Sequence, residues 1–134
     1  MSLYLEYASC DSPYACAAAP IIARKWVPVV VCHLLHGPRR FGDLRRAIPY
    51  ISAKVLTENL QFMRSEQMIV RDVRGEGSSE VWYELTARGQ DLSKVISAMN
   101  QWGLKWLKSR EVGNPVESFD HGRSNKVVIP LSQW

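Results

Sequence analysis

The sequence predicts one mainly α-helical domain that contains a single small β-hairpin. Three observations predict this class. The chain has 134 residues, which is near the usual size of one domain. Apolar residues recur at helical spacing along most of it, and two β-prone runs flank a glycine-containing turn. The content of 46% hydrophobic and 22% charged residues is that of a folded chain and excludes a disordered one.

The first part of the chain favours two helices. Residues 15–22 are rich in Ala and predict a short helix, which Pro20 would end or bend. Residues 26–35 predict a buried helix, because Pro28 is tolerated in a first helical turn, although the consecutive valines would also suit a strand. Residues 36–38, His-Gly-Pro, are a stop signal.

Two short amphipathic helices follow across a tight turn. Pro49 and Tyr50 break the first of them, and Ser52 offers a hydroxyl group that can cap the second. The apolar positions at helical spacing are Phe41, Leu44 and Ile48 in the first helix and Leu56, Leu60 and Met63 in the second.

A hairpin and a long helix complete the element order. Residues 69–74 and 80–85 are β-prone runs separated by Gly-Glu-Gly-Ser-Ser, so we expect a hairpin. Thr86 is expected to cap the last helix. This order is typical of a winged helix-turn-helix. The apolar stripe of the last helix comprises Leu92, Val95 or Ile96, Met99, Trp102 and Trp106.

We expect an N-terminal arm at residues 1–12, the main domain at 13–110 and a C-terminal extension at 111–134, where residues 127–129 could add an edge strand. The longest apolar stretch is shorter than the ~20 residues that cross a bilayer, and no secretory signal is recognised. Three cysteines without paired-ligand spacing argue against a disulfide framework and a zinc ribbon. The expected location is therefore the cytoplasm.

Positive charge is concentrated in one segment. The net charge is +4, and residues 39–74 hold eight Lys or Arg against four Asp or Glu, while the rest of the chain holds nine of each. The whole excess falls in this segment, as expected where a surface faces a polyanion. A basic run can also be ordinary solvated surface, so charge alone does not decide the function.

The helix that begins after Ser52 suits the major groove of duplex DNA. The groove admits one helix whose outer side is polar and whose inner side is anchored in a core. The alternative is a polar face that is only solvated. The candidate DNA-binding residues are Ser52, Lys54, Thr57 and Gln61 on this helix, Arg39, Arg40, Arg45 and Arg46 before it, and Arg71 and Arg74 in the first hairpin strand.

Several motifs in order resemble the HxlR-type family of winged helix-turn-helix transcriptional regulators, over about residues 13–106. The resemblance implies a homodimer built from N- and C-terminal helices, a recognition helix at residues 52–63, a wing at 71–82 and a pseudo-palindromic operator with half-sites ~34 Å apart. The motifs are Lys-Trp at 25–26, Gly-Pro-Arg-Arg-Phe-Gly-Asp-Leu-Arg at 37–45, Ile-Ser-Ala-Lys-Val-Leu-Thr at 51–57, Val-Trp-Tyr-Glu-Leu-Thr-Ala-Arg-Gly at 81–89 and Trp-Gly at 102–103.

The chain departs from the family pattern at a few positions. Ala-Arg at 23–24 replaces the common Gly-Gly, and Asn59 and Gln61 stand where arginines are usual. Gln67 replaces a Gly before the wing, and Phe62 occupies a commonly charged position. We interpret Phe62 as a covered surface aromatic rather than a dimer contact.

Many members of the family sense oxidants or electrophiles through a cysteine near the N-terminus. The matching position here is Pro13, flanked by Cys10 and Cys16, which are the candidate redox-sensing residues. Cys32 lies in the apolar run and is expected to be a packed core thiol.

His33 and His36 lack the further ligands of a metal site, and we expect them to be structural. The candidate dimer interface is the last helix, although its tryptophans could instead line a ligand pocket. The candidate residues are Leu92, Met99, Trp102 and Trp106.

No catalytic motif with supporting context is present, and neither a cofactor nor a metal is expected. The leading hypothesis is a homodimeric, sequence-specific DNA-binding transcriptional regulator that is not an enzyme. A protein-interaction module without DNA binding is the alternative. A small-molecule or oxidant effector is compatible with the leading hypothesis.

Overall fold

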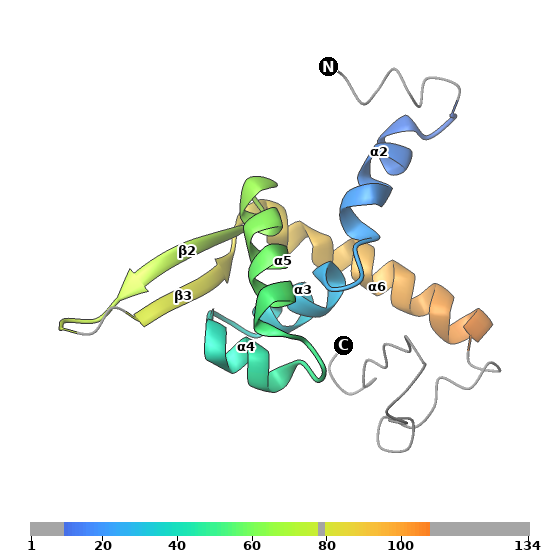
Figure 1. The fold of residues 1–134 in the computed structure, drawn as a ribbon. Helices are drawn as coiled ribbons and strands as arrows, with labels where there is room; N and C mark the ends of the chain where they lie inside the picture. Colours follow the sequence, from blue (N-terminus) through green and yellow to red (C-terminus); the bar gives the residue numbers. More distant parts are fainter. Residues whose placement is uncertain (1–9, 78–79, 108–134) are drawn as a thin grey trace.

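The structure is a computed structural model that describes residues 10–77 and 80–107. Most of the expected N-terminal arm, and all of the C-terminal extension with its candidate strand at 127–129, lie outside the described residues. The elements, in chain order, are α2 (Pro13–Ile22), α3 (Val27–Leu35), β1 (Arg39–Arg40), α4 (Phe41–Ala47), α5 (Ala53–Ser65), β2 (Ile69–Arg74), β3 (Glu80–Leu85) and α6 (Ala87–Leu107) (Figure 1).

The sheet has three antiparallel strands in the order β1-β3-β2. The hairpin strands β2 and β3 have the predicted bounds, whereas β1 was not predicted from the sequence. This strand is two residues long and follows Gly37, whose φ of 123° turns the chain after α3. Arg39 and Arg40 become a strand because they pair with β3, in register with Tyr83 and Trp82.

One hydrophobic core joins α3, α4, α5 and the base of the sheet. Residues 26–35 form a helix, as predicted, and α3 supplies five buried residues, Cys32 among them. Burial raises the pKa of the Cys32 thiol to about 11, as expected of a packed core thiol. The largest side chains that are almost fully buried are Val27, Val30, Val31, Leu34, Leu44, Ile48, Leu56, Leu60, Met63 and Met68.

Local signals fix both ends of α5. The Ser52 hydroxyl accepts a hydrogen bond from the backbone N–H of Val55 at 3.1 Å, so the predicted cap is confirmed. At the other end Gln67 adopts a left-handed φ of 58°, and the N–H of Met68 bonds the carbonyl of Met63 at 2.9 Å. This is a Schellman motif, whose left-handed position is most often Gly and is here Gln67.

Thr86 fixes the start of α6. Its hydroxyl accepts from the N–H of Gly89 at 3.1 Å and donates to the carbonyl of Gln67 at 2.6 Å, so the predicted cap is confirmed and also joins α6 to the end of α5. A Cβ at Gly89 would overlap the carbonyl oxygen of Met68. This junction therefore requires glycine.

Two helices extend away from this body. Helix α2 begins at Pro13, two residues before the predicted start, contains Pro20 inside it and buries no residue. Figure 1 shows α2 and the C-terminal half of α6 projecting on the side opposite the hairpin. Within residues 10–77 and 80–107 no single helix has the length and apolarity to cross a membrane, whereas α2 and α3 together pass that test only as a pair bent by 85°.

Candidate nucleic-acid interface

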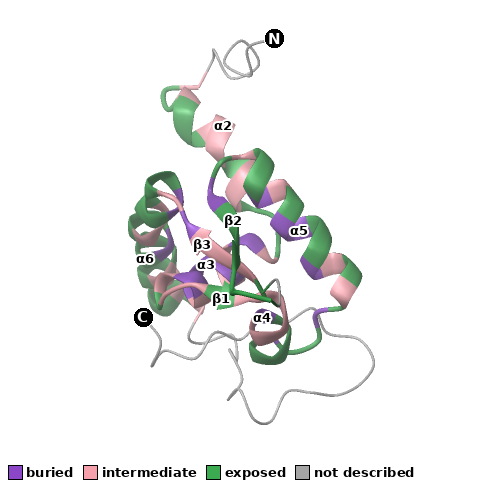
Figure 2. Cartoon of the chain, turned by 90° about the vertical axis from the view of Figure 1, so that its left-hand side faces the viewer, coloured by how far each residue is buried: buried purple, intermediate pink, exposed green. Residues whose placement is uncertain are grey.

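Helix α5 has a buried side and an exposed polar side. Figure 2 shows buried residues along the side that faces the body and exposed residues opposite. Its buried residues are Leu56, Asn59, Leu60 and Met63. The predicted contact residues Ser52, Lys54, Thr57 and Gln61 are all exposed. The inner side anchors the helix in the core. The outer side is exposed to solvent along the helix.

Three side chains of α5, those of Thr57, Asn59 and Ser65, donate hydrogen bonds to carbonyl groups of the same helix. The Thr57 hydroxyl donates to the carbonyl of Ala53 at 2.7 Å, which leaves its lone pairs as acceptors on the exposed side. Asn59 is only 6% exposed, and its amide donates to the carbonyl of Val55 at 2.8 Å. The departure from the family pattern at Asn59 therefore lies in the packed side of the helix.

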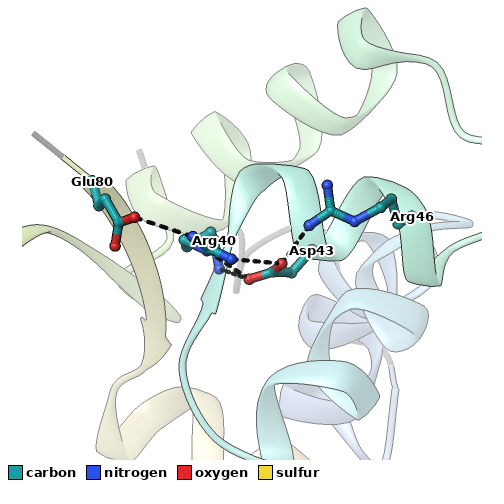
Figure 3. Close-up of polar contacts among 4 residues, drawn as sticks. All are labelled: Arg40, Asp43, Arg46 and Glu80. Atoms are coloured by element: carbon teal, nitrogen blue, oxygen red, sulfur yellow. Dashed lines mark hydrogen bonds and ion pairs between the residues drawn. The ribbon is translucent and has the colours of Figure 1, made fainter. Parts of the chain in front are cut away.

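A cluster of opposite charges surrounds the start of α4 (Figure 3). The Asp43 carboxylate accepts from Arg40 Nε at 3.0 Å and from Arg46 Nη2 at 2.6 Å, and Arg40 Nη1 also contacts Glu80 Oε1 at 3.1 Å. The backbone N–H of Arg40 bonds the same carboxylate at 3.2 Å, which caps the helix. The Arg40 side chain is the chief cause that lowers the pKa of Asp43 from 3.8 to about 2.

This cluster separates the predicted phosphate contacts into two kinds. Arg40 and Arg46 already hold a carboxylate, so a phosphate would have to share or displace Asp43. Arg45 is exposed and makes no ion pair with any residue that the structure describes. Arg45 is thus the α4 cation most available to a new anion.

The two faces of the sheet also differ in whether their arginines form ion pairs with acidic residues. Arg40 on β1 and Arg74 on β2, the two strands that flank β3, both lie over the Trp82 ring, and their guanidinium carbons are 5.6 and 5.5 Å from the ring centroid. Arg74 also pairs with Asp72 at 2.8 Å and with Glu84 at 3.2 Å. Directly paired residues of an antiparallel sheet share a face, so the arginines of the Trp82 face are all held by acids.

The opposite face carries the other two arginines. Arg39 and Arg71 are both in register with Tyr83, which places them on one face, and neither forms an ion pair within the described segments. Both are exposed. This face therefore supplies cations that need no exchange of partners to bind a phosphate.

An open depression of 570 Å³ lies between α5 and β2. Gln61, Arg64 and Arg71 line it, so it joins the polar side of the helix to the wing. Arg64 is not among the contact residues predicted from the sequence, although residues three apart on a helix, such as Gln61 and Arg64, lie on the same side.

Tyr50 is a second residue close to α5 that is not among the candidates predicted from the sequence. It lies in the turn between α4 and α5, is 64% exposed and adopts a left-handed φ of 65°. A non-glycine residue in this conformation is strained. Nothing in the sequence pattern indicates this φ, because Tyr is not a residue that favours it.

Comparison with known proteins decides the family. The chain matches the HxlR-like helix-turn-helix family over residues 21–111. This chain belongs to that family. The HTH-type transcriptional regulator YvaP of Bacillus subtilis (strain 168) is 32% identical over 90 residues, which cover 67% of this chain and 83% of YvaP.

Solved structures agree with the winged-helix fold of this HxlR-like protein. A transcriptional regulator of the MarR family from Enterococcus faecalis V583 matches with a TM-score of 0.67 and 28% identity, over 75% of this chain and 91% of that one. The reduced form of YodB, a transcriptional regulator from B. subtilis, matches with a TM-score of 0.66 and 28% identity, over 78% and 98%. YodB has also been solved bound to quinone and after diamide treatment. The chain is thus a transcriptional regulator of the HxlR winged-helix type.

The last helix of this HxlR-like chain has two halves with different surroundings. Leu92 is half-buried against the core and Ile96 is buried, so the stripe predicted for α6 turns toward the body in its first half. Met99, Trp102 and Trp106 are 49%, 61% and 58% exposed. Spaced three and four residues apart, these three share one side of the helix and form an exposed apolar surface.

Arg24 is one of the two residues at positions 23–24 where this chain departs from the family pattern, and it contacts Phe62. The Arg24 guanidinium lies 3.9 Å from the centroid of the Phe62 ring, so it covers the half-buried aromatic on α5. This agrees with the interpretation of Phe62 as a covered surface aromatic. The contact links the segment that follows α2 to α5.

The remaining candidate groups are sulfurs and imidazoles. Cys10 and Cys16 are both half-buried, and their sulfur atoms are 2.8 Å apart. Burial, followed by the charges of Arg39 and His36, lowers the pKa of His33. Across residues 10–77 and 80–107 no three His, Cys, Asp or Glu side chains are close enough to hold a metal ion.

Proposed function

We propose that this HxlR-like regulator binds duplex DNA as a homodimer, with α5 in the major groove and the hairpin β2–β3 along the neighbouring backbone. The observation that carries the proposal is the exposed polar side of α5, anchored by a buried apolar side and flanked by arginines without acidic partners. A helix of this kind fits the groove, and base edges are read by short polar side chains. The same proposal makes the protein a non-enzymatic regulator of the cytoplasm.

Roles within the interface follow from exposure and pairing. Ser52, Lys54, Thr57 and Gln61 would contact base edges and the adjoining phosphates, since they line the exposed side of α5. The arginines would supply sequence-independent affinity. Some arginines form no ion pair among the described residues and would bind phosphates directly: Arg39, Arg45, Arg64 and Arg71. The others would bind a phosphate only after they release their acidic partners: Arg40, Arg46 and Arg74.

The homodimer would form through α6 and α2. Met99, Trp102 and Trp106 form an exposed apolar surface, and aromatic residues are enriched in interface cores. A two-fold dimer presents two copies of α5 to one duplex, which implies a pseudo-palindromic operator with half-sites about 34 Å apart. Leu92 would support this surface from beneath, because it packs against the core.

Oxidants or small molecules are the proposed effectors. Support comes from the adjacent thiols of Cys10 and Cys16 and from YodB, whose quinone-bound and diamide-treated forms have been solved. In this proposal the effector changes the affinity of the dimer for its operator.

Selection of bound fragments from random duplex DNA, followed by mobility shifts in rising salt, tests the DNA proposal. We expect enrichment of a two-fold sequence and steep weakening with salt. Each phosphate contact contributes a slope of about 0.9, so a homodimer that loses one contact in each half by Arg45→Ala should lose about 1.8 from the slope. Lys94→Ala on α6 is the charge-matched control and should leave the slope unchanged. Salt-insensitive binding would contradict the proposal, and a chain that shifts no duplex would favour the protein-interaction alternative.

The double variant Trp102→Ser, Trp106→Ser tests the dimer by sedimentation. Both side chains are more than half exposed, so the monomer should stay folded by circular dichroism. One interface hot spot of about 2 kcal/mol already corresponds to about 30-fold, so the double variant should raise the dimer dissociation constant by more than about 30-fold. An unchanged dimer would rule out this surface as the interface.

A further inference from the structure

The connection between α2 and α3 turns the chain sharply. Residues 23–26 separate the two helices, which are bent by 85° relative to each other. The N–H of Ala23 bonds the carbonyl of Ala19 at 2.7 Å at the end of α2, and the carbonyl of Arg24 accepts from the N–H of Val27 at 3.0 Å at the start of α3. Arg24 therefore lies in the bend, where a small change of backbone direction changes the direction of the whole of α2.

Helix α2 itself is weakly anchored to the body. It buries no residue, and Ile21 in its last turn packs against the core from a half-buried position. Figure 1 shows the rest of the helix projecting away from the body. Packing against a core is what usually holds a helix in place. The direction of α2 therefore depends strongly on what restrains the connection.

The Arg24 side chain reaches from this connection to α5. Its guanidinium lies 3.9 Å from the centroid of the Phe62 ring, and Arg24 forms no ion pair with any residue that the structure describes. Phe62 is half-buried and packs against the core, which holds its ring in place. A guanidinium over an aromatic ring is attracted to it. The contact thus restrains the base of α2 relative to α5.

The contact lies beside the packed side of α5. Phe62 follows Asn59 by three residues and Val55 by seven, so the three share one side of the helix. Asn59 is buried and Val55 is half-buried against the core. Arg24 is therefore placed to hold α5 rather than to extend its exposed polar side.

We propose that Arg24 is a positioning residue that fixes the direction of α2 relative to α5 and thereby sets the half-site spacing of the operator. The proposal rests on the proposed function, in which α2 and α6 form the homodimer and α5 reads DNA. The distance between the two copies of α5 then depends on the direction in which each α2 leaves its own body. A dimer with this restraint selects one spacing, whereas a dimer without it accepts several.

The length of α2 makes a small rotation matter. Its ten residues form a helix about 15 Å long. A rotation of about 13° at its base moves its far end by about 3.4 Å, which is the rise of one base pair. Each added base pair also turns one half-site by about 34–36° around the duplex axis. A modest restraint at the base of α2 is therefore enough to distinguish spacings that differ by one base pair.

Distances between spin labels, measured by double electron–electron resonance, test the restraint without DNA. Labels are attached through Ala15→Cys on α2 and Glu58→Cys on α5, which are exposed helical positions. The background is Cys10→Ser, Cys16→Ser, and the remaining Cys32 is buried. Labelled chain is refolded with an excess of unlabelled chain, so that the measured distance lies within one chain. We expect one narrow distribution of distances.

Variants of both partners separate this contact from other effects. Arg24→Ala and Phe62→Leu should each shift or widen the distribution by at least about 3 Å, and the double variant should add little, because both changes remove the same contact. Arg24 is exposed, so its variant should stay folded by circular dichroism. Lys94→Ala, which removes an exposed cation from α6, is the control and should leave the distances unchanged. Identical distributions in wild type and Arg24→Ala overturn the inference.

Mobility shifts test the consequence for the operator. The selected duplex is compared with duplexes in which base pairs are added or removed between the half-sites. Wild type should bind the selected spacing at least about 5-fold more tightly than spacings that differ by one base pair. Arg24→Ala should lose most of this preference and should bind a single half-site as tightly as wild type. A loss of stability alone would instead weaken binding to every spacing by the same factor.

The outcomes distinguish this inference from the proposed function. A wild-type chain that shifts no duplex contradicts the proposed function, while the label distances still decide whether Arg24 fixes the direction of α2. If Arg24→Ala keeps the wild-type preference for one spacing, the inference is wrong. It is also wrong if the salt slope of Arg24→Ala falls as expected for Arg45→Ala and the spacing preference is kept, because Arg24 is then a phosphate contact.

Discussion

Replacing Asp43 by Asn removes the negative charge that holds Arg40 and Arg46 but keeps an oxygen that can accept the backbone N–H of Arg40. The variant therefore tests the charge cluster without removing the cap of α4. The fall in the pKa of Asp43 from 3.8 to about 2 corresponds to at most about 2.4 kcal/mol. Solvent around the exposed guanidinium groups reduces the expected loss of stability to about 1 kcal/mol.

The sign of the pH dependence follows from the direction of that change. Folding lowers the pKa of Asp43, so the stabilisation is fully present above the unfolded value of 3.8 and is lost as the pH falls toward about 2. Urea denaturation at pH 7 should show wild type about 1 kcal/mol more stable than Asp43→Asn, and at pH 3 roughly half of this difference should remain.

A matched control is Asp72→Asn, which removes an exposed carboxylate that pairs only with Arg74 among the described residues. It should cost less than about 0.5 kcal/mol. Equal stability of wild type and Asp43→Asn at pH 7, or a difference that is the same at pH 3, would refute this account of the cluster.

Three further predictions concern other elements. Gly89→Ala places a Cβ on the carbonyl oxygen of Met68 and should lower the free energy of unfolding by about 3 kcal/mol; stability near wild type would show that the junction can relax. Tyr50→Gly relieves a left-handed φ and should raise stability by about 0.5–1 kcal/mol, and an unchanged or lower stability would show that this φ stores no strain. Arg24→Ala and Phe62→Ala should be coupled by about 0.5–1 kcal/mol in a double-mutant cycle of unfolding, and simple additivity would show that the contact contributes nothing.

Elements encoded by local signals were predictable from the sequence. Ser52 and Thr86 have the residue type and spacing of helix caps, and both caps are present in the structure. The hairpin strands were placed within their observed bounds because β-prone runs flank a glycine turn. Strand β1 could not be predicted, because two residues carry no alternation and Arg39 and Arg40 are extended only through pairing with β3.

The candidate interface was predictable as a region but not in its electrostatics. The sequence places Arg71 and Arg74 in the first hairpin strand and Arg40 ahead of the two short helices. Only the register with β3 shows that Arg71 shares a face with Tyr83, while Arg40 and Arg74 lie on the Trp82 face. Their ion pairs depend on residues as distant as 40 positions in the chain. No local pattern carries such information.

The most direct test of the central claim compares Thr57→Ala with Arg45→Ala on the selected duplex and on a panel of its single-base variants. Thr57 lies on the exposed side of α5, and Arg45 is an unpaired cation of α4 within the described residues. If α5 reads base edges, Thr57→Ala should change the order of preference within the panel by about 1–3 kcal/mol at one position, whereas Arg45→Ala should weaken every member by a similar factor. The same order of preference for wild type and for Thr57→Ala, together with unchanged affinity, would contradict the placement of α5 in the groove.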